Sequence, residues 1–492
     1  MKPKEIQTPH LKNISLASTS NSHKVHSKLF DFKSNLSNKA LLLITTTMLL
    51  LVGAAFLFFK MQPYYEQLYF ERISTSWGSA LIYTSLVLLA IKLSFLGYLT
   101  ALYIKYKAVP AVSDTALPTC TVIVPAYNEG KLVWETLHSL SQSNYPKEKL
   151  ELIAIDDGSQ DDTWDWILKA KDELGDCLSI YQQPKNKGKR HALYRGFHLG
   201  KGDIFITVDS DSVVKKDTLR NMTSPFVTDE KCGAVAGNVK VLNDKQAFIP
   251  KMLNVSFAFS FEFVRSAQSV LGSVLCTPGA LAAYRRDAVM NCLPEWINQT
   301  FMGQKSNIGE DRAMTNMILK QGLHVKFQRN ALVYTNIPEN YTTLRKMFLR
   351  WERSNVRENI MMSKFAFRNF REEAKAGTRV LLLNQWLKIL LSYPMVVLMF
   401  VFAFTNPVLF FASTLTGILM FSSVQAIFYA VKHKLNESFW AYPYSVFFTF
   451  TLFWITPYAI ATAGKSGWLT RTIEETPSVK RQFIYTEEAK VA

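Results

Sequence analysis

Three short apolar runs in the middle of the chain end in polar residues, most of them acidic. The runs "VIVPAYNE", "IAIDDGS" and "FITVDSDS" end in Tyr127 and Glu129, in Asp156 and Asp157, and in Asp209 and Asp211. In an open α/β sheet, ligands bind at the carboxyl ends of the strands. One acidic ending is commonly the cap of the helix that follows, but three such endings predict a shared binding site.

Asp209 and Asp211 are separated by a single serine. Residues i and i+2 of an extended segment point the same way, so both carboxylates can face one site. Carboxylate oxygens suit a hard divalent cation that keeps positions open for substrate phosphates, and we expect Mg²⁺ or Mn²⁺ here. The alternative is a solvated turn, which the two other acidic endings disfavour.

The stretch "NKGKRHAL" places Lys187, Lys189 and Arg190 around a glycine. A basic, glycine-containing turn before a helix suits a nucleotide diphosphate. The alternative is a solvated charged loop, and we favour the binding role.

The stretch "GEDRAMTN" places Glu310, Asp311 and Arg312 at the predicted start of a helix. A carboxylate at this position could accept a proton from an attacking hydroxyl group. A plain helix N-cap is the competing interpretation, and position in the chain alone does not decide between them.

The stretch "TLRKMFLRWERSNVREN", residues 343–359, predicts an amphipathic helix. Four cations share one stripe and four apolar residues share the neighbouring face: Lys346, Arg350, Arg353 and Arg357, and Leu344, Met347, Phe348 and Trp351. A basic stripe beside an apolar one suits anionic lipid headgroups. A diphosphate clamp is the alternative, and it requires this helix to lie near the aspartate pair.

The elements that must position these groups lie between residues 117 and 340. Short β-branched runs alternate there with amphipathic stretches, which predicts an α/β domain with a mostly parallel sheet and helices on both faces. Apolar runs on either side are long enough to span a bilayer. We therefore divide the chain into a basic disordered tail (1–39), two transmembrane helices (40–104), the α/β domain (117–340), amphipathic interface helices (341–378), transmembrane helices (379–463) and a C-terminal tail (464–492).

Two stretches leave the membrane topology open. Residues 246–268 are apolar and aromatic but carry charges, so we expect an interfacial helix, with a buried helix of the α/β domain as the alternative. The late run 439–463 contains Pro457 and could form two short or re-entrant pieces, while 379–391 could lie at the interface. Either arrangement gives the cytosolic C-terminus that we favour, whereas five full spans would not.

Composition points to a membrane rather than to nucleic acid. The formal net charge is +17 and the sequence pI about 9.4, but no zinc-finger or RNA-binding signature is present. Lys and Arg accumulate in the cytoplasmic loops of membrane proteins, so we expect a lipid bilayer and no nucleic acid as partner. The five cysteines are scattered without a C-x-x-C pair, which indicates neither a disulfide framework nor a zinc site.

Together, five motifs resemble those of processive family-2 glycosyltransferases and occur in the same order: "VPAYNE", "DDGS", "DSD", "GEDR" and "RW". The pattern is most similar to hyaluronan synthases and the chitooligosaccharide synthase of rhizobia, then to chitin synthases and, more distantly, cellulose synthases. "CTPGALAAYRRDA", residues 276–288, resembles their cysteine-containing acceptor segment, and "ERSNVRE" resembles the extension of their "RW" motif.

The resemblance implies a GT-A catalytic domain carried on transmembrane helices. The expected enzyme polymerises UDP-sugars, UDP-N-acetylglucosamine with or without UDP-glucuronate, into a β-linked polysaccharide and secretes it. It would be a multi-pass protein of the plasma (inner) membrane with its catalytic domain in the cytoplasm. Its partners would be the UDP-sugar donor, the growing polysaccharide acceptor and the bilayer.

The resemblance also implies a role for each motif residue. Tyr127, Glu129, Asp156, Asp157, Lys187, Lys189, Arg190, Asp209 and Arg350 would bind UDP. Asp209 and Asp211 would hold the metal. Asp311, assisted by Glu310, Arg350 and Trp351, would carry the catalytic step with Asp311 as base. Cys276, Pro278, Gly279, Arg312, Met347 and Trp351 would face the acceptor.

Three segments depart from the family pattern. Met347 stands where the Q-x-x-R-W motif has glutamine, Thr277-Pro278-Gly279-Ala280 replaces a Ser-Gly-Pro segment, and Trp468-Leu469-Thr470-Arg471 replaces a W-G-T-R-like ending. All three concern the acceptor, so hyaluronan and a chitin-like homopolymer both stay open. A non-processive transferase to a lipid acceptor is disfavoured by the "RW" segment and late apolar helices, and a degenerate scaffold by the intact acids.

Overall fold

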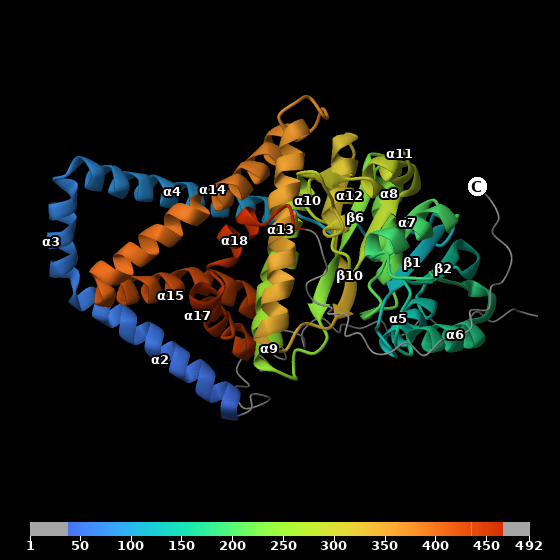
Figure 1. The fold of residues 1–492 in the computed structure, drawn as a ribbon, viewed down its shortest axis with the longest axis horizontal. Helices are drawn as coiled ribbons and strands as arrows, with labels where there is room; N and C mark the ends of the chain where they lie inside the picture. Colours follow the sequence, from blue (N-terminus) through green and yellow to red (C-terminus); the bar gives the residue numbers. More distant parts are fainter. Residues whose placement is uncertain (1–37, 434, 466–492) are drawn as a thin grey trace, which may run out of the picture.

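The computed structural model describes residues 38–433 and 435–465. Figure 1 shows a sheet domain at one end of the molecule, long helices at the other, and helix α13 (Tyr341–Ala366) standing between the two. Most of the predicted N-terminal tail, and almost all of the C-terminal tail with its Trp468–Arg471 motif, lie outside the described residues.

The sheet has eight strands. In spatial order they are β3 (Leu178–Gln182), β2 (Leu150–Asp156), β1 (Cys120–Ala126), β4 (Ile204–Thr207), β7 (Ala282–Arg285), β6 (Cys232–Val241), β10 (His324–Thr335) and β5 (Ser212–Val214). The first four are parallel, β7 is antiparallel to both its neighbours, β10 is parallel to β6, and β5 is antiparallel to β10. The predicted mostly parallel sheet is therefore confirmed.

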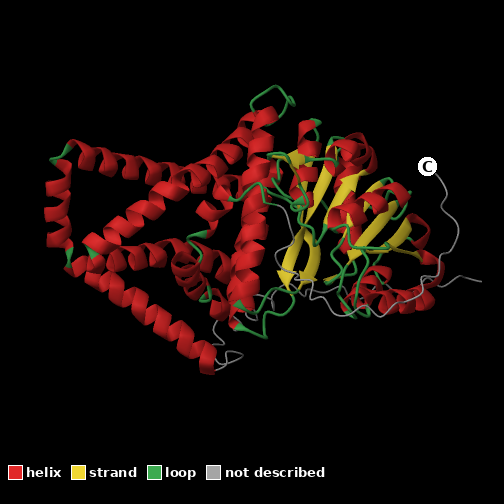
Figure 2. Cartoon of the chain, in the orientation of Figure 1, coloured by secondary structure: helices red, strands yellow, loops and turns green. Residues whose placement is uncertain are grey.

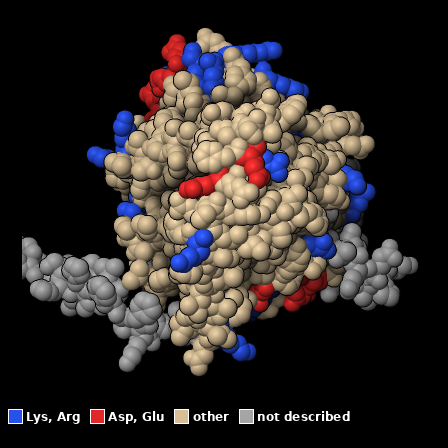
Figure 3. Space-filling model, turned by 90° about the vertical axis from the view of Figure 1, so that its left-hand side faces the viewer, with Lys and Arg blue, Asp and Glu red and all other residues tan. Residues whose placement is uncertain are grey.

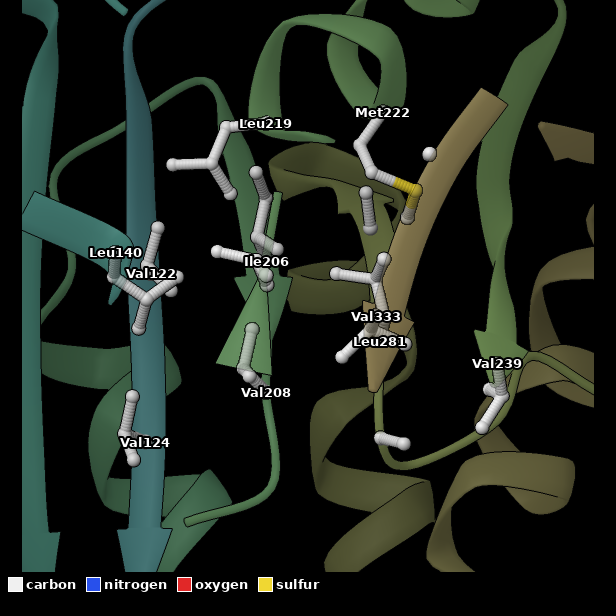
Figure 4. Packing of buried hydrophobic residues seen from close by; sticks show 14 of the residues in the cluster. Val122, Val124, Leu140, Ile206, Val208, Leu219, Met222, Val239, Leu281 and Val333 are labelled. Atoms are coloured by element: carbon white, nitrogen blue, oxygen red, sulfur yellow. The ribbon is translucent and has the colours of Figure 1, made fainter. Parts of the chain in front are cut away.

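Helices cover both faces of this sheet, as predicted (Figure 2). They are α5 (Leu132–Ser141), α6 (Thr163–Leu174), α7 (Lys189–Leu199), α8 (Thr218–Thr228), α11 (Arg286–Ile297) and α12 (Glu310–Lys320). Strand alternation explains the two cores. Val122 and Val124 of β1 pack in one cluster with Leu140 of α5, whereas Ile123 packs in the opposite cluster with Phe197 of α7. Figure 4 shows the first of these clusters.

The apolar stretch 246–268 forms α9 (Phe248–Phe257), a π-helical segment (Ala258–Arg265) and α10 (Ser266–Val270). These segments contact β6 and β10 on one side, and on the other they contact the long helix α4 (Ser76–Lys105) and α17 (Ala441–Thr451). They therefore lie between the sheet domain and the helical end of the molecule.

Four helices are long and apolar enough to cross a membrane: α2 (Asn38–Lys60), α4, α14 (Lys375–Thr405) and α15 (Pro407–Lys432). Leu435–Thr451, which holds the short α16 (Leu435–Ser438) and α17, and α18 (Ile455–Ala461) form a pair bent by 45°, so the described chain has up to five candidate spans. Helix α3 (Gln62–Ile73) links α2 to α4. Figure 3 views this end of the molecule, and most of its surface is neither acidic nor basic.

One region differs from the sequence-based division, and the structure decides one arrangement that the sequence left open. The region predicted as interface helices, 341–378, is one helix that ends at Ala366, followed by a loop, and α14 already begins at Lys375. The run 439–463 is broken between α17 and α18, the arrangement in two short pieces that the sequence left open.

Candidate active site

The carboxyl ends of the parallel strands place the acidic endings side by side. The Asp157 amide donates to the Ala126 carbonyl at 2.8 Å, and the Val208 amide donates to the Ile123 carbonyl at 3.1 Å. These bonds continue the pairing with β1 by one residue beyond the ends of β2 and β4. Tyr127, Asp157 and Asp209 consequently follow neighbouring strands at one sheet edge, as the sequence predicted.

Asp157 is buried and organises the basic turn. Its Oδ1 accepts from Gln183 Nε2 and from the Lys187 amide, both at 3.0 Å, and its Oδ2 accepts from the Gly188 amide at 2.7 Å. Burial raises the pKa of Asp157 to about 6, although the two backbone amides act in the opposite direction. The carboxylate thus fixes the turn that precedes Lys189.

Asp156 and the first loop are held in a similar way. Burial raises the pKa of Asp156, whose carboxylate accepts from Ser159 and, at 3.0 Å, from Gln182 Nε2. Asn128 adopts a positive φ of 52°, and its Oδ1 accepts from the Gln160 amide at 2.8 Å. The Glu129 amide donates to Thr163 Oγ1 at 2.8 Å. The loops after β1 and β2 therefore form one bonded unit.

Lys189 joins two of the predicted motifs. Its Nζ donates to Asp209 Oδ1 and lies 3.6 Å from Glu310 Oε1. Burial alone would lower the pKa of Lys189, but the charges of Asp209 and Glu310 outweigh it and raise that pKa. An ammonium group therefore lies between the acids of β4 and those of α12.

Asp311 lies near Lys189 and Glu310, and it contacts Cys276 of the predicted acceptor segment. Cys276 Sγ is 3.7 Å from Asp311 Oδ2. Burial raises the pKa of Asp311, the charge of Glu310 raises it further, and Lys189 lowers it. Burial likewise raises the pKa of Cys276, to about 12, so its sulfur is a neutral thiol beside the carboxylate.

The segment that follows Cys276 is fastened to α12. The Thr277 amide donates to Thr315 Oγ1 at 3.1 Å, and the Thr277 hydroxyl lies 2.9 Å from the Tyr284 hydroxyl. Gly279 approaches the acids closely, because a Cβ atom there would lie 2.6 Å from Lys189 Nζ and 3.5 Å from Asp209 Oδ2. Only a residue without a side chain keeps that space open.

Asp209 and Asp211 have the donor chemistry of a divalent metal site. They flank a tight turn in which the Ser212 amide donates to the Asp209 carbonyl at 3.1 Å, and Thr335 Oγ1 donates to Asp211 Oδ1 at 3.3 Å. Within residues 38–433 and 435–465, no group of three His, Cys, Asp or Glu side chains could hold a metal on its own. Two carboxylates, of which that of Asp209 lies close to Gly279, suit an ion that substrate oxygens complete.

Three predicted residues bond or pack elsewhere. Arg190 is buried and donates to the Trp296 carbonyl at 2.7 Å and to Gln299 Oε1 at 3.0 Å. Arg312 is also buried, and both its Nη atoms donate to asparagine side chains of α13 at 2.5 Å. Met347 packs in the hydrophobic cluster that contains Leu344. None of the three is oriented as a ligand-facing group.

The basic stripe of α13 divides into two parts. Lys346 and Arg350 are half-buried, whereas Arg353 and Arg357 are buried inside the protein. Arg353 Nε donates to Thr462 Oγ1 at 2.9 Å, and Arg357 Nη2 donates to the Ile308 carbonyl. The stripe is therefore not a continuous lipid-facing surface. Trp351 is 40% exposed, with its ring centroid 6.3 Å from that of Phe257 on α9.

Arg265 is a site residue that the sequence reasoning did not assign. It ends the π-helical segment, and its guanidinium carbon lies 3.7 Å from the centroid of Phe261. Burial lowers its pKa, which the nearby Cys276 and Asp311 raise, and its Nη1 has no hydrogen-bond partner among the described residues. The available signal was a lone arginine within an apolar, aromatic stretch.

The sheet domain is similar in sequence to known glycosyltransferases. The family described as "Glycosyltransferase like family 2" matches residues 118–354. An N-acetylglucosaminyltransferase of Rhizobium meliloti (strain 1021) is 31% identical over 255 residues, 52% of this chain and 59% of the relative. A hyaluronan synthase of Streptococcus pyogenes is 31% identical over 271 residues, 54% of this chain and 62% of the relative. The chain thus spans about three-fifths of the length of these curated relatives.

One solved structure aligns over a larger share of the chain. It is a mannosyltransferase from Pyrobaculum calidifontis in complex with GDP-Man and Mn²⁺, with 19% sequence identity and a TM-score of 0.49. The alignment covers 76% of this chain and 96% of that one.

Proposed function

Residues 118–354 are a glycosyltransferase family 2 domain, and on that premise we propose that the chain is a membrane-embedded, processive, inverting glycosyltransferase that polymerises UDP-sugars. One observation carries the proposal. Lys189, Asp209, Glu310 and Asp311 come from three separate motifs and meet beside Cys276 and Gly279. This cluster combines the proposed base, Asp311, with the ammonium group of Lys189 and the carboxylates of Asp209 and Glu310.

The donor nucleotide is assigned to the loops that follow β1 and β2. Tyr127, Glu129, Asp156 and Asp157 hold uridine and ribose, and Lys187, Lys189 and Arg350 hold the diphosphate. The support is that Asp157 binds the backbone of Lys187 and Gly188 and so fixes the basic turn. Arg190, which follows this turn, is buried and holds it in place by donating to the Trp296 carbonyl.

Asp209 and Asp211 are assigned to Mg²⁺ or Mn²⁺. When bound, a divalent ion would neutralise charge that develops on the departing diphosphate. Lys189 and Arg350 add positive charge on the protein's own side of the site. Gly279 leaves room for the Lys189 ammonium group beside Asp209.

The transfer itself is a single displacement. Asp311 accepts the proton of the acceptor hydroxyl, whose oxygen forms a bond to the anomeric carbon of the donor sugar. The bond between that carbon and the diphosphate oxygen breaks, and UDP leaves with the electron pair, so the configuration at the carbon inverts. Its raised pKa makes Asp311 a stronger base for this proton transfer.

The acceptor and the membrane complete the proposal. Trp351 offers an exposed indole face for a sugar ring, and Cys276, Pro278 and Gly279 form the segment beside the base. The names of the curated relatives favour N-acetylglucosamine as one donor. The apolar helices would place the protein in the plasma (inner) membrane, with the catalytic domain cytoplasmic and the polysaccharide secreted through the helices.

The test is to incubate the purified full chain with each UDP-sugar, singly and in pairs, with Mg²⁺ or Mn²⁺. The product is then digested with linkage-specific hydrolases. A long aqueous product from UDP-N-acetylglucosamine alone identifies a chitin-like polymer, and a requirement for UDP-glucuronate identifies hyaluronan. Radiolabel recovered only in the organic extract contradicts processive synthesis and supports transfer to a lipid acceptor.

A further inference from the structure

Glu358 is a fully buried carboxylate on α13 that the proposed reaction does not use. Its Oε1 accepts from Gln299 Nε2 at 2.9 Å and from Arg357 Nε at 3.2 Å, and its Oε2 accepts from Asn316 Nδ2 at 3.0 Å. A buried charge is costly unless hydrogen bonds satisfy it. Here both oxygens are satisfied, by three side chains from different parts of the domain.

Each partner of Glu358 is attached to a segment that carries a site residue. Gln299 Oε1 accepts from Arg190 Nη1 at 3.0 Å, and Arg190 directly follows Lys189. Arg357 Nη2 donates to the carbonyl of Ile308, which precedes Gly309 and Glu310. Asn316 lies on α12, the helix that begins with Glu310 and Asp311.

The loop that leads to Asp311 has few other fixed points. Residues 298–309 connect α11 to α12 and contain only the short hairpin of β8 (Thr300–Phe301) and β9 (Gln304–Lys305). The Ser306 amide donates to the Gln299 carbonyl at 2.9 Å, so Gln299 anchors both ends of this hairpin. Gly309 then abuts Ser354 of α13. The start of α12 is consequently placed by α13 together with Trp296 of α11, whose Nε1 donates to the Glu310 carbonyl at 2.9 Å.

We propose that Glu358 is a positioning residue, which through Gln299, Arg357 and Asn316 holds Asp311 and Lys189 in register for transfer. This inference rests on the proposed function for its kinetic consequence. A buried charge network is weak support for stability, and its best-attested use is to specify one geometry. Through Gln299 the bonds of Glu358 lead to the segment of Lys189, and through Arg357 and Asn316 they lead to the start of α12. A residue that positions both groups must be connected to both.

Glu352 provides a matched control on the same helix. It is also buried, but its Oε1 accepts from Lys388 Nζ of α14 at 2.8 Å and from Thr456 Oγ1 of α18 at 3.1 Å, and its Oε2 accepts from Asn355 Nδ2 of the same helix at 3.1 Å. Glu358→Gln and Glu352→Gln therefore remove the same charge from the same helix. Only the first substitution alters direct bonds to the loop and to α12, because Glu352 is linked to α12 only through Asn355, whose Oδ1 accepts from Arg312 Nη1.

The experiment uses the full chain in lipid nanodiscs. For Glu358→Gln we expect kcat to fall by about 10- to 100-fold, since small displacements of reacting groups are that costly. The KM for the UDP-sugar should stay within about twofold, because Glu358 does not contact substrate. Glu352→Gln should keep kcat within about twofold of the wild type. An unchanged kcat for Glu358→Gln, or an equal loss for Glu352→Gln, would overturn the inference.

A swapped pair protects the test against a simple folding defect. Gln299→Glu alone places two carboxylates at hydrogen-bond distance and should lower kcat. Combined with Glu358→Gln it again pairs one amide with one carboxylate, and the carboxylate introduced at position 299 can still accept from Arg190. In the double variant we expect kcat to recover by at least about threefold over Glu358→Gln, since the two substitutions share one hydrogen bond. No recovery would contradict positioning by these hydrogen bonds.

Hydrogen exchange separates this inference from the proposed function. Amide exchange in residues 299–312 should be faster in Glu358→Gln than in the wild type and unchanged in Glu352→Gln. If the wild type transfers no sugar from any UDP-sugar, the proposed function fails and exchange alone decides the positioning role. Unchanged exchange in residues 299–312 of Glu358→Gln would refute that role.

Discussion

Helix α13 carries two buried glutamates that face different parts of the molecule. Glu358 binds side chains of the catalytic domain, and its partner Arg357 has a side chain only 2% exposed. Glu352 binds the helical end of the molecule, and the side chain of its partner Lys388 is 50% exposed. One helix therefore meets the domain through a dry network and meets α14 through an ion pair that water reaches.

The two glutamates are expected to restrain α13 to different degrees. Hydrogen bonds in a dry interior are strong and specify one arrangement, and leaving one partner unsatisfied is costly. An ion pair with an exposed ammonium group is screened and contributes little. We therefore expect the domain side of α13 to hold fixed geometry, whereas the side that faces the apolar helices can shift.

The largest expected effect lies on the domain side, at Asp311. Asp311→Asn removes the base while keeping the size of the side chain, so polymer formation should fall by about 10²- to 10⁴-fold. UDP binding should be largely intact, because the nucleotide is assigned to other residues. Calorimetric titration with UDP and a radiolabel assay for polymer measure the two quantities. Undiminished polymer from this variant would refute the assignment of the base.

Gly309 offers the next test of the contact between α12 and α13. It adopts a positive φ of 71°, and an added Cβ atom would overlap Ser354 Oγ and lie 2.6 Å from Ser354 Cβ. Gly309→Ala should lower kcat by about 10- to 100-fold, because the first turn of α12 must move.

Two further variants decide how the Gly309 result is read. Ser354→Gly in the Gly309→Ala background should restore part of the rate, since the overlap is relieved while the backbone strain stays. Gly417→Ala on α15, where an added Cβ atom meets nothing within 4 Å, should leave kcat unchanged. Equal losses for Gly309→Ala and Gly417→Ala would remove the contrast between the two sides of α13.

The sequence predicted the sheet edge and most of the acidic site, because local patterns carry that information. Strand alternation and the position of polar residues at strand ends are properties of neighbouring residues, so Asp157 and Asp209 could be placed together. The helix geometry behind the stripe of α13 was also predictable. The residues that pack on each face of a helix are far away in the chain, and the local sequence pattern of α13 did not contain that information.

Arginine residues illustrate that limit. Arg190, Arg312 and Arg353 were expected to meet a ligand or lipid, yet each is buried and bonded to groups more than 40 residues away in the chain. A guanidinium group has five donors and satisfies buried carbonyl and amide oxygens as readily as phosphates. The type and spacing of cationic residues therefore could not distinguish arginines that bind a substrate from arginines that form internal hydrogen bonds.

The smallest expected effect concerns Glu352, and it depends on pH. Burial alone would raise the pKa of Glu352, but the Lys388 ammonium and the hydrogen bonds outweigh it and lower that pKa below the usual 4.5. A carboxyl with a lowered pKa in the folded state stabilises the protein above about pH 4.5, and this contribution is lost as the pH falls through the folded-state value.

Glu352→Gln should therefore lower the free energy of unfolding by about 1 kcal/mol at pH 7, and by less at lower pH. Melting temperatures of the wild type and the variant in one detergent, measured from pH 7 down to about pH 2.5, should differ by a constant amount above about pH 4.5 and converge below it. Glu352→Asp keeps the charge on a shorter side chain. It therefore shows whether stability is lost through the missing charge or through the longer distance to Lys388. A gap in melting temperature that is constant across this range would mean that the pair with Lys388 contributes no charge interaction. The contrast between the two sides of α13 would then rest on hydrogen bonding alone.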